Sequence, residues 1–232
     1  DPQHQDQSVW AINIDDAGGH HVVIGAPQSG RTTFLRAFAA GIATTHTPTQ
    51  VSVYGLDLRG AGLARLSGFP HVGGVASREQ AEELTRVVEE LSLMLRQREE
   101  IFRDSSIESM EQFRSLHAAG SIQGVVSADV VLLVDGFGFL RTDYERLADA
   151  VSELLTRGGS YGIHVVAAVT RWAEIPIRLQ PLFGSRYELR LNDPTESTIA
   201  RKLSDSIKTP GRVLTQGKLF AQLAIPRIDD DE

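Results

Sequence analysis

The segment from residue 21 to residue 35, HVVIGAPQSGRTTFL, combines the residue types that bind phosphate. The pattern G-x-x-x-x-G-K-[ST] is matched there by Gly25, Gly30, Arg31 and Thr32, except that arginine replaces lysine. An apolar run precedes the glycines and a helical pattern follows them, so the loop would end at a helix N-terminus. Glycines let the backbone approach an anion closely, and free N–H groups at a helix N-terminus attract its charge. The pattern therefore predicts a nucleotide phosphate loop, although a glycine-rich turn without a ligand is the alternative.

We expect every residue of this loop to contact the nucleotide, which we predict to be ATP. The expected nucleotide-binding residues of the loop are Gly25, Ala26, Pro27, Gln28, Ser29, Gly30, Arg31, Thr32 and Thr33.

A magnesium ion is the expected companion of the phosphates. Thr32 is placed to give its hydroxyl to a Mg²⁺ ion that bridges the β- and γ-phosphates. Such sites also need an aspartate at the end of a neighbouring strand, and Asp135 follows the apolar run from Val130 to Val134. Apolar residues followed by an acid are common, so an ordinary strand-end aspartate is the alternative. Thr32 and Asp135 are the predicted metal ligands.

Two residues argue against fast hydrolysis. Arg31 carries a planar guanidinium that can hold phosphate oxygens but follows the γ-phosphate less well than the ammonium of lysine does. Gly136 occupies the position where hydrolysing enzymes of this layout commonly carry a glutamate that polarises the attacking water. Without such a base the hydrolytic step slows by about 10²–10⁴-fold. We therefore expect ATP binding with slow or undetectable turnover, and no residue is assigned confidently as catalytic.

Further polar residues at strand ends are candidates for contacts with the γ-phosphate. Thr170 could act there as a sensor, or be an ordinary strand-end threonine. Asp57 could face the γ-phosphate or a neighbouring subunit, but a strand-terminating turn is the favoured interpretation. Efficient hydrolysis would need an arginine finger from another subunit. The sequence offers several candidates without choosing among them, including Arg59, Arg157 and Arg171.

The composition excludes other classes of site. The 232 residues include no cysteine, which excludes disulfides, zinc–thiolate sites and cysteine nucleophiles. The seven histidines lack metal-ligand spacing, and no nucleophile-elbow pattern occurs. The net charge is −7, from 23 Lys and Arg against 30 Asp and Glu, which is opposite to the usual bias of nucleic-acid-binding proteins. The longest uninterrupted apolar runs, such as Val130 to Val134, are too short to insert into a membrane.

The elements that must position these residues alternate along the chain. Apolar and β-branched runs predict strands at residues 9–14, 21–25, 50–57, 129–135, 164–170, 186–191, 212–214 and 219–225. Helical periodicity predicts helices over residues 78–103, 143–157 and 193–203. This alternation predicts an α/β fold, a mostly parallel sheet with helices on both faces. The last two strands, joined at Gln216-Gly217, predict an antiparallel hairpin at the sheet edge.

One domain is expected to account for most of the chain. Domains commonly have roughly 100–200 residues, and no internal repeat divides this sequence, so we expect a single domain over residues 9–226. Residues 1–8 are a predicted polar end or linker, and residues 227–232 a predicted acidic tail.

Five segments carry a resemblance to a known family. They are GAPQSGRTTFLR (25–36), VYGLDLRGAGLARLSGFPHVGGVASR (53–78), VLLVDGFG (131–138), YGIHVVAAVTRWAEI (161–175) and ELRLNDPTES (188–197). Within them, PHVGGVA and TRWAEI are far more particular than the phosphate loop. These segments resemble the FtsK/SpoIIIE family of P-loop motor ATPases. More closely, they resemble the EccC-type ATPases of mycobacterial type VII (ESX) secretion, and among their three modules the second, central one.

The resemblance implies a RecA-like P-loop NTPase fold, ATP with Mg²⁺, and a place at the cytoplasmic side of the inner membrane within a membrane-associated complex. The implied partners are the other ATPase modules of the same protein, other subunits of the complex, and small helical-hairpin secreted substrates. It further implies that Asp193, Pro194 and Arg212 lie near the nucleotide base, with helix-cap and loop chemistry as the alternative. It also implies a module whose ATP is structural or regulatory, which Arg31 and Gly136 fit.

The leading hypothesis is therefore a degenerate ATPase module that binds Mg·ATP to control contacts with modules and substrates. One alternative is an active DNA-translocating motor of the FtsK kind, which would need a hydrolytic site and a basic channel. The acidic net charge argues against that function, and no nucleic-acid partner is expected. Another alternative is an interaction module that holds no nucleotide.

Overall fold

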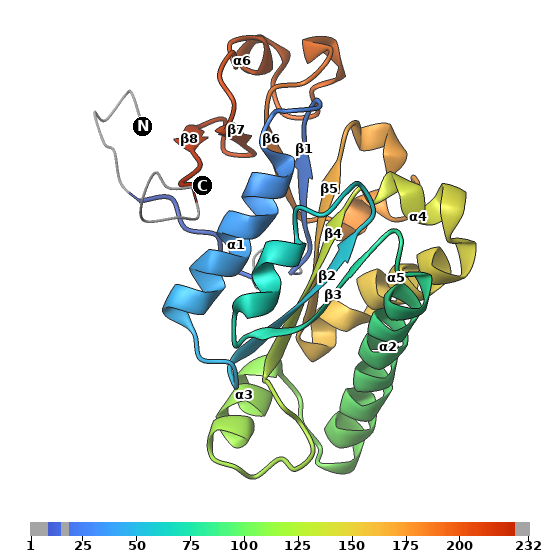
Figure 1. Cartoon of the computed structure of the whole chain (residues 1–232). Helices are drawn as coiled ribbons and strands as arrows, with labels where there is room; N and C mark the ends of the chain where they lie inside the picture. Colours follow the sequence, from blue (N-terminus) through green and yellow to red (C-terminus); the bar gives the residue numbers. More distant parts are fainter. Residues whose placement is uncertain (1–8, 15–18, 226–232) are drawn as a thin grey trace.

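The computed structural model describes residues 9–14 and 19–225, and its centre is an eight-stranded sheet (Figure 1). The strand order is β3-β2-β4-β5-β1-β6-β7-β8. All pairs from β3 to β6 are parallel, whereas β7 pairs antiparallel with both β6 and β8, so the predicted edge hairpin is confirmed. The strands are β1 (His21–Ile24), β2 (Val51–Asp57), β3 (Val72–Ser77), β4 (Asp129–Asp135), β5 (Ile163–Val169), β6 (Ser185–Glu188), β7 (Arg212–Thr215) and β8 (Phe220–Gln222). The predicted end segments, residues 1–8 and 227–232, lie outside the described residues.

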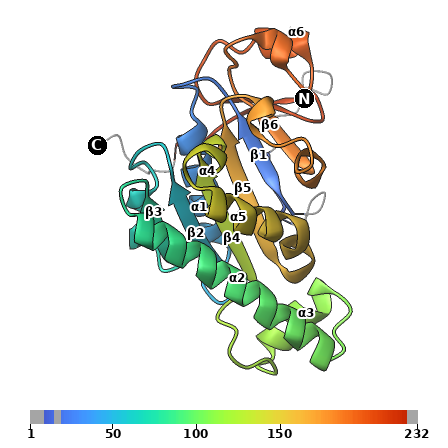
Figure 2. The ribbon, with the colours of Figure 1, turned by 90° about the vertical axis from the view of Figure 1, so that its right-hand side faces the viewer.

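Helices cover both faces of the sheet, as predicted. Helix α1 packs on one face, and α2 and α5 lie side by side on the other, where α4 joins them (Figure 2). Helix α3 lies at the end of the sheet where β4 begins (Figure 1). Within the described residues, no helix has both the length and the apolar character to cross a membrane. The helices are α1 (Arg31–Thr45), α2 (Ala81–Asp104), α3 (Met110–Ala118), α4 (Gly138–Asp143), α5 (Glu145–Arg157) and α6 (Arg201–Asp205).

Strand β4 lies inside the sheet and is buried on both faces. Val131 and Leu133 face the apolar cluster beneath α1, whereas Val130, Leu132 and Val134 face the cluster beneath α2 and α5. Such double burial explains why this segment is continuously apolar rather than alternating. The strand therefore holds Asp135 firmly at its C-terminal end.

The long helices follow their predicted apolar stripes. In α2 the buried residues recur at helical spacing, and the helix ends near the predicted boundary. Helix α5 ends at Arg157, as predicted, with Gly158 as its C-cap, and a 3-10 turn (Gly158–Tyr161) follows it. The chain leaves this turn at Gly162, whose φ of 68° is left-handed.

Two sequence predictions require correction. Residues 9–14 form no strand and instead pack against the α1 side of the core, where Trp10 meets Tyr187 edge-on with ring centroids 5.3 Å apart. The predicted helix over residues 193–203 is a 3-10 turn (Pro194–Glu196) followed by the short α6. Glu188 interrupts it, because its carboxylate accepts hydrogen bonds from the Ser197 hydroxyl and the Thr198 N–H, both at 2.7 Å.

Among the strands and α-helices, β3, α3 and the short α4 escaped prediction. Strand β3 is an edge strand whose middle, Gly73-Gly74, is untypical of strands. Helix α3 is short, and its signal is mainly a cap, with the Gln112 N–H donating to the Ser109 hydroxyl at 3.2 Å.

Candidate nucleotide-binding site

The predicted phosphate loop connects β1 to α1 at the C-terminal edge of the parallel strands. Its beginning is fixed by two backbone hydrogen bonds, from the Gly25 N–H to the Val169 carbonyl at 3.1 Å and from the Ala26 N–H to the Arg190 carbonyl at 2.8 Å. A Cβ at Gly25 would lie 2.3 Å from the Ser29 hydroxyl oxygen. A residue larger than glycine therefore fits at this position only if the Ser29 and Leu189 side chains shift.

The end of the loop turns sharply into α1. Gln28 and Gly30 adopt left-handed φ values of 60° and 109°, and Gly30 is the N-cap of the helix. Gly30 has no side chain to cap the helix, and the first turn contains no acidic residue. The first N–H groups of an α-helix have no acceptor within the helix. The N-terminus of α1 can therefore offer its N–H groups and positive potential to an anion.

The edge hairpin meets the loop where β7 begins. The Gly211 N–H donates to the Ser29 carbonyl at 3.0 Å, and a Cβ at Gly30 would lie 3.4 Å from the Gly211 nitrogen. The residue that precedes β7 thus supports the Ser29-Gly30 turn of the phosphate loop.

The two predicted metal ligands contact each other. The Thr32 hydroxyl donates to Asp135 Oδ2 at 2.5 Å, whereas Asp135 Oδ1 is buried without a hydrogen-bond partner among the described residues. Burial raises the pKa of Asp135, and the nearby Asp57 raises it further, against the opposing effect of the Thr32 hydrogen bond. A buried carboxylate oxygen without a partner, beside a hydroxyl, fits a hard cation that prefers oxygen ligands.

A metal ion at this place would need further ligands from outside the protein. In the described ranges, no group of three or more His, Asp or Glu side chains could hold an ion by itself. Phosphate oxygens and water would complete the shell, which is how Mg²⁺ commonly binds in nucleotide sites.

Arg31 is buried and reaches the end of β5. Its Nη1 donates to the Thr170 hydroxyl at 2.6 Å, so the structure brings these two predicted residues together. Burial lowers the pKa of Arg31, as does the nearby Arg59, while Asp135 and Glu174 oppose that shift. Glu174, which sequence analysis missed, accepts a hydrogen bond from the Thr170 N–H at 3.1 Å. The only sequence signal for it was its place within the distinctive TRWAEI segment.

Gly136 adopts a left-handed conformation with a φ of 88°, and a side chain covers it. A Cβ at this position would lie 2.5 Å from Arg59 Cγ. The guanidinium of Arg59 continues to the Thr170 hydroxyl, to which its Nη1 donates at 3.2 Å. Arg59 therefore lies beside the position where related enzymes would place a catalytic carboxylate.

The other two candidates for an arginine finger lie near acidic side chains instead. Arg157 pairs with Glu99 and Glu153, and Arg171 is exposed, 4.0 Å from Glu196.

Asp57 terminates its strand, as the favoured interpretation stated. Its Oδ1 accepts from the Gly60 N–H at 3.0 Å and its Oδ2 from the Leu63 N–H at 2.8 Å. Both carboxylate oxygens are therefore used in fixing the loop after β2.

The side chains of the three residues expected near the base make other contacts in the structure. Asp193 caps the following turn by accepting from the Thr195 N–H at 2.8 Å, and this bond lowers its pKa. Pro194 is the first residue of that turn. The Arg212 guanidinium lies over the Phe220 ring, 5.0 Å from its centroid. The helix-cap alternative accounts for Asp193, and within the described residues none of the three side chains forms a hydrogen bond with the phosphate loop.

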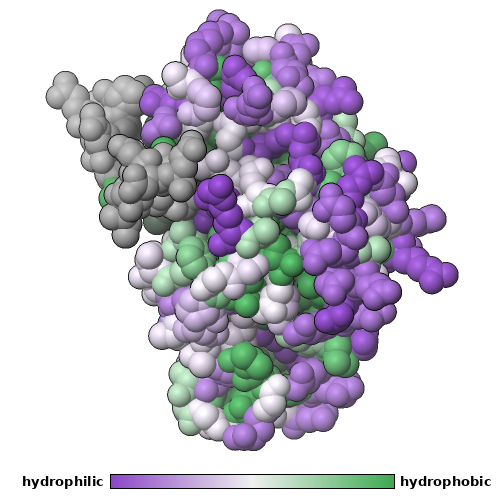
Figure 3. All heavy atoms as spheres, viewed as in Figure 1, coloured by the Kyte–Doolittle hydropathy of each residue, from purple (hydrophilic) through white to green (hydrophobic). Residues whose placement is uncertain are grey.

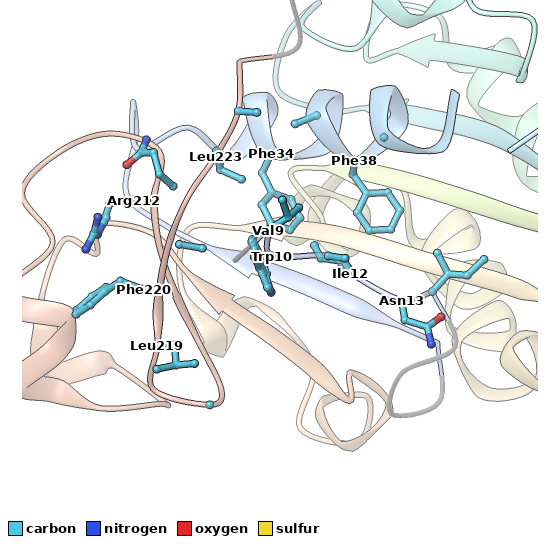
Figure 4. A pocket seen from close by; sticks show the side chains of 18 of the residues that line it. Val9, Trp10, Ile12, Asn13, Phe34, Phe38, Arg212, Leu219, Phe220 and Leu223 are labelled. Carbon is cyan, nitrogen blue, oxygen red and sulfur yellow. The ribbon is translucent and has the colours of Figure 1, made fainter. Parts of the chain in front are cut away.

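A separate groove of 1810 Å³ lies between α1, residues 9–14 and the β7–β8 hairpin. Figure 4 shows apolar side chains around it from all three segments, with Arg212 and Phe220 at one end. The labelled residues that line it include Trp10, Phe34, Phe38, Leu219 and Leu223. It is distinct from the Thr32–Asp135 pair, because neither residue lines it.

Comparison with known proteins agrees with the resemblance. EccC of Thermomonospora curvata is 41% identical over 232 residues, which is 99% of this chain and 18% of that protein. EccCb1 of the ESX-1 system of Mycobacterium tuberculosis is 35% identical over 233 residues, 99% of this chain and 39% of that protein. The chain thus spans about a fifth to two fifths of the length of these relatives.

Solved structures give the same result. The cytoplasmic domain of T. curvata EccC matches the whole chain with a TM-score of 0.94 at 41% identity, and the chain covers 27% of it. A structure of ATPases 2 and 3 of that EccC, in complex with a signal sequence peptide, matches 95% of the chain with a TM-score of 0.90 at 42% identity, and the chain covers 40% of it. The predicted P-loop ATPase fold and EccC resemblance are confirmed. Since the FtsK/SpoIIIE family model matches residues 1–230, the chain belongs to the FtsK/SpoIIIE family.

Proposed function

We propose that the chain is a degenerate ATPase module of a type VII secretion motor. It binds Mg·ATP, hydrolyses it slowly or not at all, and uses the bound state to set its contacts with neighbouring modules and substrates. The observation that carries this proposal is an open phosphate loop beside Gly136, a position that offers no catalytic carboxylate and is covered by Arg59.

Binding would begin at the N-terminus of α1. Its free N–H groups, together with the Arg31 guanidinium, would hold the phosphate chain. Thr32 and Asp135 would hold the metal ion, and the unpartnered Oδ1 of Asp135 supports this assignment. A bound Mg²⁺ ion would neutralise part of the phosphate charge.

Slow turnover follows from the residues at the end of the site where the terminal phosphate would lie. Glycine at position 136 cannot accept a proton from an attacking water, and the loss of a general base slows hydrolysis by about 10²–10⁴-fold. The carboxylate of Glu174 is held by the Thr170 N–H, and both oxygens of Asp57 accept backbone hydrogen bonds.

The setting of the module is inferred from its EccC relatives. We infer that it works at the cytoplasmic side of the inner membrane, as the central ATPase module of a membrane-associated complex. Its partners would be the adjacent ATPase modules, other subunits, and small helical-hairpin substrates. The complex of T. curvata EccC with a signal sequence peptide supports a role for such substrates. Neither nucleic acid binding nor direct membrane insertion by this segment is proposed.

Calorimetric titration of the chain with ATP and Mg²⁺ tests the proposal. We expect saturable binding and stabilisation by mass action, about 2.7 kcal/mol at a ligand concentration of 100 times Kd. Gly30→Asp should abolish both effects, because it puts a side chain and a negative charge into the loop and strains a left-handed residue.

Gly41→Asp is the matched control, since it makes the same change in α1 where a Cβ would meet no atom within 4 Å. It should retain wild-type nucleotide binding. Melting without nucleotide verifies that both variants fold. No heat and no thermal shift for the wild type at millimolar ATP, or full binding by Gly30→Asp, would refute the proposal.

A further inference from the structure

Two guanidinium groups converge on one hydroxyl at the end of β5. The Nη1 atoms of Arg31 and Arg59 both donate to Thr170 Oγ1, at 2.6 and 3.2 Å. A threonine hydroxyl has two lone pairs and can accept both bonds. The two positive charges nevertheless repel each other across this small distance, and that repulsion contributes to the lowered pKa of Arg31.

The nearby carboxylates do not neutralise these charges directly. Within the described part of the chain, neither Arg31 nor Arg59 has a carboxylate oxygen within the 4.0 Å of an ion pair. Asp57 and Glu174 instead accept backbone hydrogen bonds, and Asp135 accepts the Thr32 hydroxyl. A pair of convergent cations without a direct counter-ion is suited to an anionic ligand.

Arg59 is held in place by its loop. The Leu58 N–H donates to the Asp135 carbonyl at 3.0 Å, and Asp57 fixes the following residues. A Cβ at Gly62 would lie 2.4 Å from Thr32 Cγ2, so this loop rests directly on the first turn of α1. Arg59 is therefore a built part of the site, although its side chain is exposed to solvent.

The position of Arg59 indicates which phosphate it would meet. In a phosphate loop the backbone N–H groups cradle the inner phosphates, and the terminal phosphate extends beyond them. Arg59 contacts Gly136 and Thr170, at the ends of β4 and β5, and forms no hydrogen bond with the Ser29-Gly30 turn in the described structure. It therefore lies on the terminal-phosphate side.

We propose that Arg59 is a specificity-determining residue that binds the terminal phosphate of a nucleoside triphosphate and so distinguishes it from a diphosphate. The inference rests on the proposed function. It assigns to this chain's own loop a positive charge that hydrolysing relatives would receive from another subunit. In this site, which has no general base at position 136, the Arg59 charge would instead distinguish a bound triphosphate from a bound diphosphate.

The experiment measures binding of ADP and of adenylyl imidodiphosphate, a non-hydrolysable ATP analogue, by calorimetry with Mg²⁺. Arg59→Gln should lower the affinity for the analogue about tenfold, in the range of one lost charge-assisted hydrogen bond. Its affinity for ADP should stay within about twofold of the wild type. Arg59→Lys keeps the charge without the planar fork and should recover part of the loss.

Arg78→Gln is the matched control. The guanidinium carbons of Arg78 and Arg59 both lie near the Phe139 ring, 5.5 and 6.0 Å from its centroid. Arg78, however, forms an ion pair with Asp143, with its Nη2 2.9 Å from Oδ2. It should change the affinity for neither nucleotide.

Equal losses for ADP and the analogue in Arg59→Gln, or no loss for either, would overturn the role of Arg59 and leave nucleotide binding intact. A wild-type chain that binds neither nucleotide would instead overturn the proposed function, and the role of Arg59 with it. A melting curve of each variant without nucleotide separates these outcomes from misfolding.

Discussion

Position 136 favours glycine over any other residue, because of both its backbone conformation and the atoms packed around it. Its φ is 88°, and L-residues pay about 1–2 kcal/mol in the left-handed region. A Cβ would lie 2.5 Å from Arg59 Cγ and 3.0 Å from Phe139 Cδ2. A glutamate placed here would therefore strain the backbone and displace Arg59.

We accordingly expect Gly136→Ala and Gly136→Glu each to lower the free energy of unfolding by at least about 1–2 kcal/mol. Gly136→Glu by itself should leave phosphate release at the wild-type level. Denaturant unfolding and a phosphate-release assay measure the two effects. Gly60→Ala serves as the control, because a Cβ at Gly60 would meet no atom within 4 Å. A stable Gly136→Glu variant with faster hydrolysis would contradict this account.

Strands β4 and β5 carry a second buried polar cluster at their other end. Asp129 accepts two hydrogen bonds from Arg114, at 2.7 and 2.9 Å, and its Oδ1 lies 3.1 Å from His164 Nε2. Burial by itself would raise the pKa of Asp129, but the hydrogen bonds with His164 and Arg114 hold it below the usual range. This cluster ties α3 to the start of β4.

His20 lies next to this cluster and is buried in its neutral form. Its Nδ1 accepts from the Val165 N–H at 3.0 Å. Burial, together with the nearby His164, lowers the pKa of His20 from 6.5 to about 3. The neutral ring therefore belongs to the folded state.

These shifts predict a loss of stability in acid. Between pH 6.5 and about 3 the unfolded chain protonates His20 but the folded chain does not, so the free energy of unfolding falls as pH falls. One proton of difference gives a slope of about 1.4 kcal/mol per pH unit. Asp129 adds to the loss at the lower end, as the pH falls below the ordinary aspartate pKa and through its depressed folded value.

Urea unfolding at several pH values measures this dependence. His20→Asn retains an acceptor near the Nδ1 position and removes the titrating ring, so its slope between pH 6.5 and 3 should be smaller. At pH 8 the ring is neutral in both states, so the difference in the free energy of unfolding between the wild type and His20→Asn gives the packing cost of the substitution. An unchanged slope would mean that His20 is not the group responsible.

At the scale of the whole molecule, charge bears on the alternative function. The net charge of −7 disfavours a long-range attraction to nucleic acid. On the face in Figure 3, hydrophilic residues dominate the upper and right-hand parts, and apolar residues form separate patches. Large exposed apolar side chains such as Leu93 of α2, and Val126 and Ile177 of two separate loops, come from different parts of the chain, and single exposed apolar residues are ordinary.

We expect double-stranded DNA to leave phosphate release at its basal rate. The measurement compares release with and without DNA at 50 and 200 mM salt, because binding through phosphates would be much stronger at the lower concentration. Stimulation by DNA that declines with salt would favour the translocating motor over the secretion module.

Local pattern was sufficient to predict much of the fold. Strand β4 is continuously apolar because both of its faces are buried, and α2 shows its buried stripe directly in the sequence. Prediction was wrong for residues 9–14 and incomplete for residues 193–203, where the deciding contacts involve Tyr187 and Glu188. The Trp10–Tyr187 contact joins distant parts of the chain, whereas the Glu188 hydrogen bonds reach the next segment, nine and ten residues away. Neither kind of contact leaves a local periodicity in the sequence.

Some features of the candidate site could likewise be predicted from the sequence, whereas others were decided only by the tertiary structure. The order of residues from 25 to 33, and an aspartate after an apolar strand, indicated a phosphate loop and a metal ligand, because both depend on short spacings within one segment. Only the tertiary structure decided that Arg59 covers Gly136 and shares Thr170 with Arg31. Parallel strand order places the end of β4 between the ends of β2 and β5, so that Arg59 meets Thr170, 111 residues further along the chain. No spacing in the sequence encodes that meeting.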